Sequence, residues 1–429
     1  MEIYVVQQGD DIYTIAEKFG VSADKIIRDN GLNNPSNLVI GQTIVIVYPK
    51  QSHIVQDGDT LQDIADAYDV PLMQLLRNNP HLTDRGYLVP GEALVISYNT
   101  ERSAVTNGFA YSYIKRETLA KILPNLTYLS VFNYSTIQGG GIIAYDEDDM
   151  DVINMAKEYG TIPLMMITTL TSQGVPNLEV AYDILTNEEY QDRNINEFVA
   201  IMKQKGYSGL NIILNYLTEN NQSQYFPLMR KISERLQQEG LLFFATINYS
   251  TQEEDGSITV QQIDYSQFSM YLNGMLFLKF LWGTNVDPPA PVSNINNVRA
   301  IAEYVSAMVP AEQILIGKPI LGYDWQLPYI PGRSYATSIS IDSAIDLAYG
   351  TGAVIQFDDV SQTPYFYYNQ IYFGAPVQHI VWFIDARSIN ALDDLIVEFA
   401  LNGSGIWNVM IYYPQVWTLM NARFDIIKL

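Results

Sequence analysis

The chain contains no cysteine and only three histidines among its 429 residues. This composition excludes disulfides and thiolate chemistry and leaves few ligands for a metal site, so we expect neither a metal nor another cofactor. Positive charge is also scarce, because 24 Lys and Arg stand against 47 Asp and Glu, a formal net charge of -23. A surface of this sign repels nucleic-acid phosphates and anionic lipids, so we expect neither nucleic acid nor a membrane as a partner.

Long hydrophobic runs are missing as well. No apolar run approaches the ~20 residues that a membrane-spanning helix needs. The N-terminal stretch "MEIYVVQQGD" has no basic start followed by an apolar segment, so we expect no signal peptide. What the chain does have is a core-forming composition, with 48% hydrophobic and 17% charged residues, over a length that suggests two or more domains.

The N-terminal part is an internal repeat. "IYVVQQGDDIYTIAEKFG" aligns with "SHIVQDGDTLQDIADAYD", so that Gly9-Asp10 matches Gly58-Asp59, and Asn30 matches Asn79 further on. Each copy predicts a strand, an Asp-capped helix, a second helix and a final strand. Both copies resemble the LysM module, and we expect these two βααβ modules at residues 1–49 and 50–98. The resemblance implies that they bind N-acetylglucosamine chains of peptidoglycan or chitin.

In LysM modules a shallow glycan groove lies between the loop after the first strand and the loop before the second. The resemblance places in this groove Gly9, Asp10, Asp11, Ile12, Asn30, Gly31 and Leu32 of the first copy, and Gly58, Asp59, Thr60, Leu61, Asn79, Pro80, His81 and Leu82 of the second. The alternative is that Asp10 and Asp59 cap helices and the glycines form turns.

From about Thr100 the pattern changes to short apolar runs separated by amphipathic segments. There are eight runs: "NGFAYSY", "LTYLSVFNY", "TIPLMMITTL", "SGLNIILNYL", "LLFFATINYS", "MLFLKFLWG", "QILIGKPILGY" and "SGIWNVMIYY". Buried strands that alternate with helices indicate parallel βα units, and eight units predict an α/β protein with a (β/α)₈ TIM barrel over residues 100–429. Residues of about 326–378 fit neither pattern and predict a small α+β insertion after strand seven.

The barrel part resembles glycoside hydrolase family 18. "LTYLSVFNY", "GYSGLNI", "LGYDWQLPYIPG", "HIVWFIDARS" and "GIWN" occur in the order typical of that family. The resemblance is strongest to the LysM-bearing N-acetylglucosaminidases that degrade spore cortex in bacilli. It implies a substrate-assisted glycosidase whose site lies at the C-terminal ends of the strands. It also implies spore association, by deposition from the mother cell, with a cytoplasmic or cell-wall location as the alternative.

The fourth strand of that family carries the acidic motif D-x-x-D-x-D-x-E, which ends in the general acid. In this chain its four positions hold Ser208, Asn211, Ile213 and Asn215, and two positions of the sixth strand hold Phe280 and Leu281. An amide cannot protonate a leaving oxygen, and loss of general acid catalysis costs about 10²–10⁴-fold in rate. These replacements predict a pseudoenzyme without catalytic residues.

Aromatic and amide side chains at the strand ends suit sugar binding without cleavage. We expect glycan contacts in the barrel from Tyr111, Asn215, Trp282, Tyr323 and Trp407. Trp407 matches the tryptophan that floors the sugar site in the family. The alternative is that these aromatic residues belong to the core.

Three functions remain open. The leading prediction is a peptidoglycan-binding, lectin-like or scaffold protein with a catalytically degenerate barrel. The second is a regulator that docks a protein partner, such as an active cortex hydrolase, at the barrel face. The third is a residual N-acetylglucosaminidase or chitinase-like hydrolase that uses other acids, such as Asp324 or Asp385.

Overall fold

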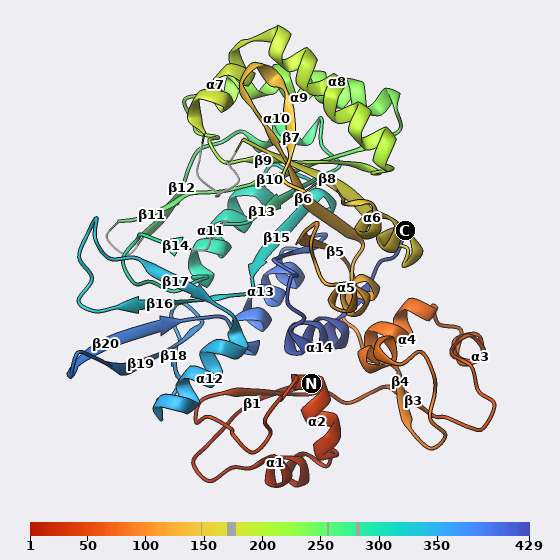
Figure 1. Cartoon of the computed structure of the whole chain (residues 1–429). Coiled ribbons are helices and arrows are strands. Elements are labelled where there is room, and N and C mark those ends of the chain that lie inside the picture. Colours follow the sequence, from red (N-terminus) through yellow and green to blue (C-terminus); the bar gives the residue numbers. More distant parts are fainter. Residues whose placement is uncertain (147, 170–176, 255–256, 280–283) are drawn as a thin grey trace.

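A closed barrel of eight parallel strands forms the centre of the molecule (Figure 1). The computed structural model describes every residue except 147, 170–176, 255–256 and 280–283. The strands follow the order β5-β21-β15-β13-β10-β9-β8-β6, and pairing of β5 with β6 closes the ring. Their bounds are β5 Arg102–Tyr111, β6 Tyr128–Thr136, β8 Ile162–Thr168, β9 Gly209–Leu214, β10 Leu242–Ile247, β13 Gly274–Phe277, β15 Ile314–Pro319 and β21 Gly403–Trp407. All eight overlap the predicted apolar runs, although β5 begins five residues before its run, and the predicted fold class is confirmed.

Helices surround the barrel and cover the outer faces of its strands. They are α5 (Arg116–Ile122), α6 (Met150–Glu158), α7 (Leu178–Thr186), α8 (Glu188–Lys205), α9 (Gln222–Gln238), α10 (Tyr265–Ser269), α11 (Ile295–Ser306), α13 (Ala386–Glu398) and α14 (Pro414–Arg423). Short strands β7 (Ile142–Ala144) and β22 (Phe424–Ile426) pair with β6 and β5, and β11 (Thr251–Glu254) pairs antiparallel with β12 (Ser257–Val260). Among the described residues, no helix is long and apolar enough to cross a membrane.

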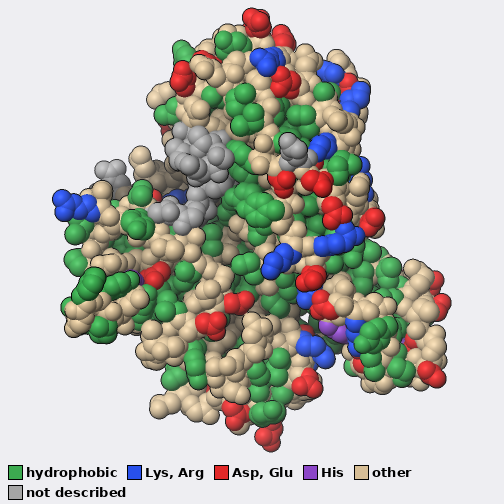
Figure 2. Space-filling view, viewed as in Figure 1, with side chains coloured by type: hydrophobic (Ala, Val, Ile, Leu, Met, Phe, Trp, Pro, Cys, Tyr) green, Lys and Arg blue, Asp and Glu red, His purple; other side chains and the backbone are tan. Residues whose placement is uncertain are grey.

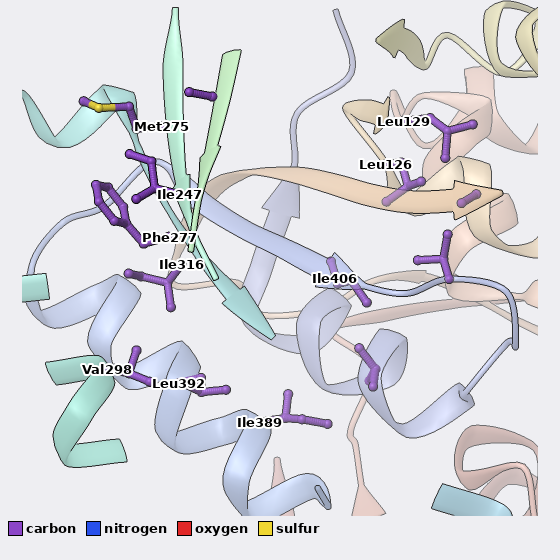
Figure 3. Packing of buried hydrophobic residues seen from close by; sticks show 14 of the residues in the cluster. Leu126, Leu129, Ile247, Met275, Phe277, Val298, Ile316, Ile389, Leu392 and Ile406 are labelled. Atoms are coloured by element: carbon purple, nitrogen blue, oxygen red, sulfur yellow. The ribbon is translucent and has the colours of Figure 1, made fainter. Parts of the chain in front are cut away.

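Side chains on the barrel strands alternate between two cores. Outward-facing residues such as Ile247, Phe277 and Ile316 pack against Val298 of α11 and Leu392 of α13 (Figure 3). Inward-facing residues form a second cluster, which consists of Val105, Phe109, Tyr128, Phe132, Leu164, Met166, Ile213, Phe244, Leu276, Leu278, Leu315 and Trp407. The alternation follows from the two-residue period of a strand and explains why both faces had to be apolar.

An α+β insertion follows the seventh barrel strand, β15. It contains β16 (Gly322–Gln326), β17 (Ala336–Ile339), α12 (Ile341–Thr351), β18 (Gln356–Asp358), β19 (Thr363–Tyr372) and β20 (Ala375–Trp382). These strands and β14 (Thr284–Asn285) form one sheet in the order β14-β17-β16-β20-β19-β18. The sequence analysis expected this insertion at about residues 326–378. Its first strand begins four residues earlier than that, and its last strand ends four residues later.

The two N-terminal modules have the predicted βααβ order and a small core each. The first consists of β1 (Glu2–Val5), α1 (Ile12–Phe19), α2 (Ala23–Asn30) and β2 (Thr43–Ile46). The second consists of β3 (Gln51–Ile54), α3 (Leu61–Ala67), α4 (Leu72–Asn78) and β4 (Ala93–Ser97).

The helix caps differ from the sequence-based expectation. Asp11 caps α1 by accepting hydrogen bonds from the backbone N–H groups of Tyr13 and Thr14, and Thr60 caps α3. The expectation that Asp10 and Asp59 cap these helices is wrong. Each instead accepts a hydrogen bond from the backbone N–H three residues earlier and closes the turn after its strand.

Helix α14 of the barrel fastens both modules. Gln415 donates to Asn30 Oδ1 (3.0 Å) and to the carbonyl of Thr43 (2.7 Å) in the first module. Asn421 donates to the carbonyl of Arg77 in the second module at 3.2 Å. At Gly31 the first module approaches α14 so closely that an added Cβ atom would lie 2.5 Å from a Pro414 side-chain atom. These contacts hold the three parts in one arrangement.

Candidate functional site

Aromatic side chains gather at the C-terminal end of the barrel, around the last residue of β5. The Tyr111 ring stacks on Tyr113, with centroids 5.3 Å apart, and meets Phe132 and Trp407 edge-on. Burial raises the pKa of Tyr111 to about 12, and the neighbouring tyrosines contribute to the rise, so its hydroxyl stays protonated at neutral pH. Tyr113 is 68% exposed. The pair offers a stacking surface of the kind that binds the apolar faces of sugars.

The predicted motif positions lie on β9 and just beyond it. Ile213 is buried in the interior cluster, whereas its neighbour Leu214 belongs to the outer core. Asn215 follows the strand and is half-buried, and its Nδ2 atom has no hydrogen-bond partner among the described residues. Both residues border a cavity of about 50 Å³, which Thr168 and Tyr216 also line. This space has room for a water molecule and polar groups to hold it.

Asn211, the second motif position, has a structural role. Its Nδ2 atom donates to Ser130 Oγ, and its Oδ1 atom accepts from Thr246 Oγ1, each at 2.9 Å. Ser130 in turn donates to Asn107 Oδ1 at 2.9 Å. These four buried residues form a polar chain that joins β5, β6, β9 and β10 inside the barrel.

Sequence reasoning missed a carboxyl group near the aromatic residues. Asp146 follows β7 and accepts a hydrogen bond from Ser112 Oγ, which lies one residue after β5, at 3.2 Å. Asn133 fixes this loop, because its amide bonds both the backbone N–H (2.8 Å) and the carbonyl (2.7 Å) of Asp146. The preceding Tyr145 stacks on Phe132. Asp146 therefore lies at the strand ends, half-buried beside the aromatic group.

Two of the predicted aromatic contacts are placed in the core. Tyr323 is 1% exposed and packs against Trp325, which gives it a structural role in place of the predicted glycan contact. Trp407 is 2% exposed and meets Phe109 edge-on inside the barrel, so only its neighbour Tyr111 extends toward the surface. The predicted positions Phe280, Leu281 and Trp282 lie outside the described residues.

The two acids considered as alternatives are engaged elsewhere. Asp324 lies on β16 in the insertion, where it accepts from Tyr368 (2.6 Å) and bonds His379 (3.0 Å). Asp385 caps α13 and pairs with Arg387, which also bonds the carbonyl of Gly41 in the first module. Neither arrangement presents its carboxyl group to the strand ends of the barrel.

The predicted groove residues of the N-terminal modules divide into two sets. Asn30 and Asn79 are buried, and each binds backbone groups of its own module through its amide. Ile12 belongs to the buried core of its module, as does Leu82. At least partly accessible are Gly9, Asp10, Asp11, Gly31, Leu32, Gly58, Asp59, Thr60, Leu61, Pro80 and His81. These remain the predicted glycan contacts of the modules.

Comparisons with known proteins assign families to both parts. The LysM domain model matches residues 4–47 and 53–97, and the model of glycosyl hydrolases family 18 matches residues 95–410. The cortical fragment-lytic enzyme of Bacillus subtilis (strain 168) is 30% identical over 100% of this chain and 99% of its own length. The crystal structure of the spore cortex-lytic enzyme SleL of Bacillus megaterium QM B1551 is 32% identical, with a TM-score of 0.79, over 100% of this chain and 99% of that one. The SleL structure of Bacillus cereus is 28% identical, with a TM-score of 0.78, over the same shares.

These findings overturn the leading functional prediction. A catalytically degenerate binding protein, not an enzyme, was expected from the residues at the motif positions. Relatives that match the whole chain are named lytic enzymes, and the family model that covers the barrel is one of hydrolases. The comparisons therefore favour hydrolysis, which the sequence analysis had ranked below glycan binding and partner docking.

Proposed function

Because the chain belongs to the glycosyl hydrolases family 18, we propose that it is a slow glycosidase acting on N-acetylglucosamine-containing peptidoglycan. The observation that carries this proposal is the match to a cortical fragment-lytic enzyme along 100% of this chain and 99% of that enzyme. Both modules and the barrel are thus matched together. The proposal extends to spore association, since the relatives are named for spore cortex.

The chemistry requires a proton for the leaving oxygen as the glycosidic bond breaks. In a substrate-assisted reaction the N-acetyl oxygen of the sugar attacks its own anomeric carbon, and an acid protonates the departing oxygen. We assign Asp146 to this role, because it is a carboxyl group at the strand ends beside Tyr111 and Tyr145. Asn215 supplies an amide that can bind the sugar but cannot deliver a proton.

The two modules have a separate task in this proposal. They hold the polymer near the barrel, which raises the effective concentration of the sugar at the barrel mouth even where the barrel itself binds it weakly. This arrangement suits a slow enzyme, since retention compensates in part for poor proton transfer.

Turnover is the direct test of the proposal. We expect the wild-type protein to hydrolyse cortical peptidoglycan fragments slowly, and Asp146→Asn to lower the rate by about 10²-fold, as removal of a general acid does. The measurement is release of reducing ends at enzyme excess over several hours.

A neighbouring carboxylate provides the control. Asp148→Asn removes an exposed acid from the same loop and should leave the rate within about twofold of wild type. A folded wild-type protein that releases no reducing ends would overturn the proposed function. Equal rates for wild type and Asp146→Asn would remove only the assignment of the acid.

A further inference from the structure

A large cleft lies where the two modules meet the barrel. Its volume is about 1070 Å³, which is ample for an oligosaccharide or a short peptide. The first module contributes α2, the second contributes the end of α4 and the residues that follow, and the barrel contributes α5, α14 and the segments before them. The loops Gly9–Ile12 and Gly58–Leu61 of the predicted grooves do not line it, whereas Gly31, Pro80 and His81 from the other side of those grooves do.

The cleft reverses the charge balance of the chain. Five Lys or Arg and three Asp line it, namely Lys25, Arg28, Arg77, Lys115, Lys121, Asp29, Asp84 and Asp342, whereas the whole chain has about twice as many acids as bases. Figure 2 shows Lys, Arg and His side chains around the hollow beside the second module. A patch of positive charge attracts an anionic ligand, whereas the acidic remainder of the protein surface repels it.

Two of these cations are available to a ligand. Lys25 pairs with Asp29, Lys121 with Asp84 and Arg77 with Asp425. Arg28 of the first module and Lys115 of the barrel are exposed, and neither forms an ion pair within the described part of the chain. Burial lowers the pKa of His81 in the second module, and the positive charge of Arg28 lowers it further. Arg28 therefore lies close enough to act across the cleft.

The walls of the cleft are held in place before any ligand arrives. Thr418 of α14 donates to the carbonyl of Asp29 at 2.7 Å, and Asn421 donates to the carbonyl of Arg77 at 3.2 Å. One helix thus fixes both modules. A preformed site loses less conformational entropy when it binds.

The cleft borders the aromatic group at the end of β5. Tyr113 lines it and also stacks on Tyr111, the residue that contacts Phe132 and Trp407 at the strand ends. A chain of sugars seated on the two tyrosines would therefore extend toward Arg28 and Lys115.

We infer that this cleft binds the carboxylate-bearing part of the glycan, through Arg28 of the first module and Lys115 of the barrel. The inference rests on the proposed function for the class of polymer. Peptidoglycan has two sources of such carboxylates, the lactyl ether of its muramic sugar and the ends of its stem peptides. Charge-assisted hydrogen bonds from guanidinium and ammonium groups suit either source.

The test compares acidic and neutral ligands on the full-length protein by calorimetry at low salt. The ligands are an N-acetylglucosamine tetramer, the N-acetylglucosaminyl-muramic acid disaccharide, and the same disaccharide with its stem peptide. The variant is Arg28→Gln/Lys115→Gln. We expect its affinity for at least one acidic ligand to fall by about tenfold, while its affinity for the neutral tetramer stays within about twofold. The acidic ligand that responds identifies the source of the carboxylate.

A matched variant controls for net charge. Lys203→Gln/Arg230→Gln removes two exposed cations from α8 and α9, remote from the cleft, and should leave all affinities unchanged. If the cleft variant binds both acidic ligands as tightly as wild type does, or loses neutral and acidic binding equally, the inference is wrong. Binding is measured separately from turnover. A protein that selects carboxylates and shows no hydrolysis would overturn the proposed function and support this inference.

Discussion

Carboxyl groups at positions 213 and 215 should raise turnover of a chromogenic N-acetylglucosaminide by about 10²–10⁴-fold in the Asp146→Asn variant, which lacks its own general acid, since this is the range that general acid catalysis contributes. The substitutions are Ile213→Asp and Asn215→Glu, added to Asp146→Asn. Asn215 stands just after β9, beside a cavity that contains room for a water molecule. The glutamate would supply the proton directly, and the aspartate would orient the acetamide and adjust the acid.

Asn215→Glu alone, added to Asp146→Asn, should raise the rate far less, by about tenfold, because an acid without its orienting partner contributes little. Asn215→Gln extends the side chain but adds no acid, and it should leave the rate unchanged. Circular dichroism and thermal unfolding would show that each variant is folded. If the folded variant with all three changes is no faster than Asp146→Asn, residue 215 does not lie beside the scissile bond.

The barrel could be predicted because buried strands leave a strong signal in the sequence. Each of the eight apolar runs overlaps a barrel strand, since parallel strands covered on both faces need continuous hydrophobic residues. The attachment of the modules left no such signal. It depends on single polar contacts from Gln415, Thr418 and Asn421 to residues more than 340 positions away, and any exposed helix can carry such residues.

The candidate site was predicted less well than the fold. A tryptophan at the end of a strand has the same sequence pattern whether it faces a sugar or the core, and Trp407 proved to be buried. Asp146 was missed because it precedes no recognisable motif. Its position depends on Asn133 and Ser112, which come from two other segments. Asn211 stands at a position where the family has an acid, yet it bonds two polar side chains in the barrel interior, Ser130 and Thr246, which makes it a structural residue.

One buried ion pair joins barrel strand β15 to helix α13. Lys318 of β15 is 1% exposed and pairs with Asp393 of α13, whose side chain is fully buried. Burial lowers the pKa of Lys318 and raises the pKa of Asp393, so desolvation disfavours both charges. Their mutual attraction opposes this effect, and the charge of Arg423 also favours the Asp393 carboxylate. The Oδ2 atom of Asp393 has no hydrogen-bond partner among the described residues. Such a pair contributes little net stability, but each partner depends strongly on the other.

Removing one partner of this pair should therefore destabilise the barrel severely. We expect Lys318→Met and Asp393→Leu each to lower the free energy of unfolding by about 3–5 kcal/mol, because each leaves a buried charge without compensation. The double variant Lys318→Met/Asp393→Leu should lose far less than the sum, since no buried charge remains and the apolar side chains fill similar volumes. The measurement is the midpoint of urea unfolding of the barrel, monitored by tryptophan fluorescence. Lys203→Met, which changes an exposed residue, is the control and should shift the midpoint little. Additive losses in the double variant would show that packing around the two side chains, and not their charges, sets the cost.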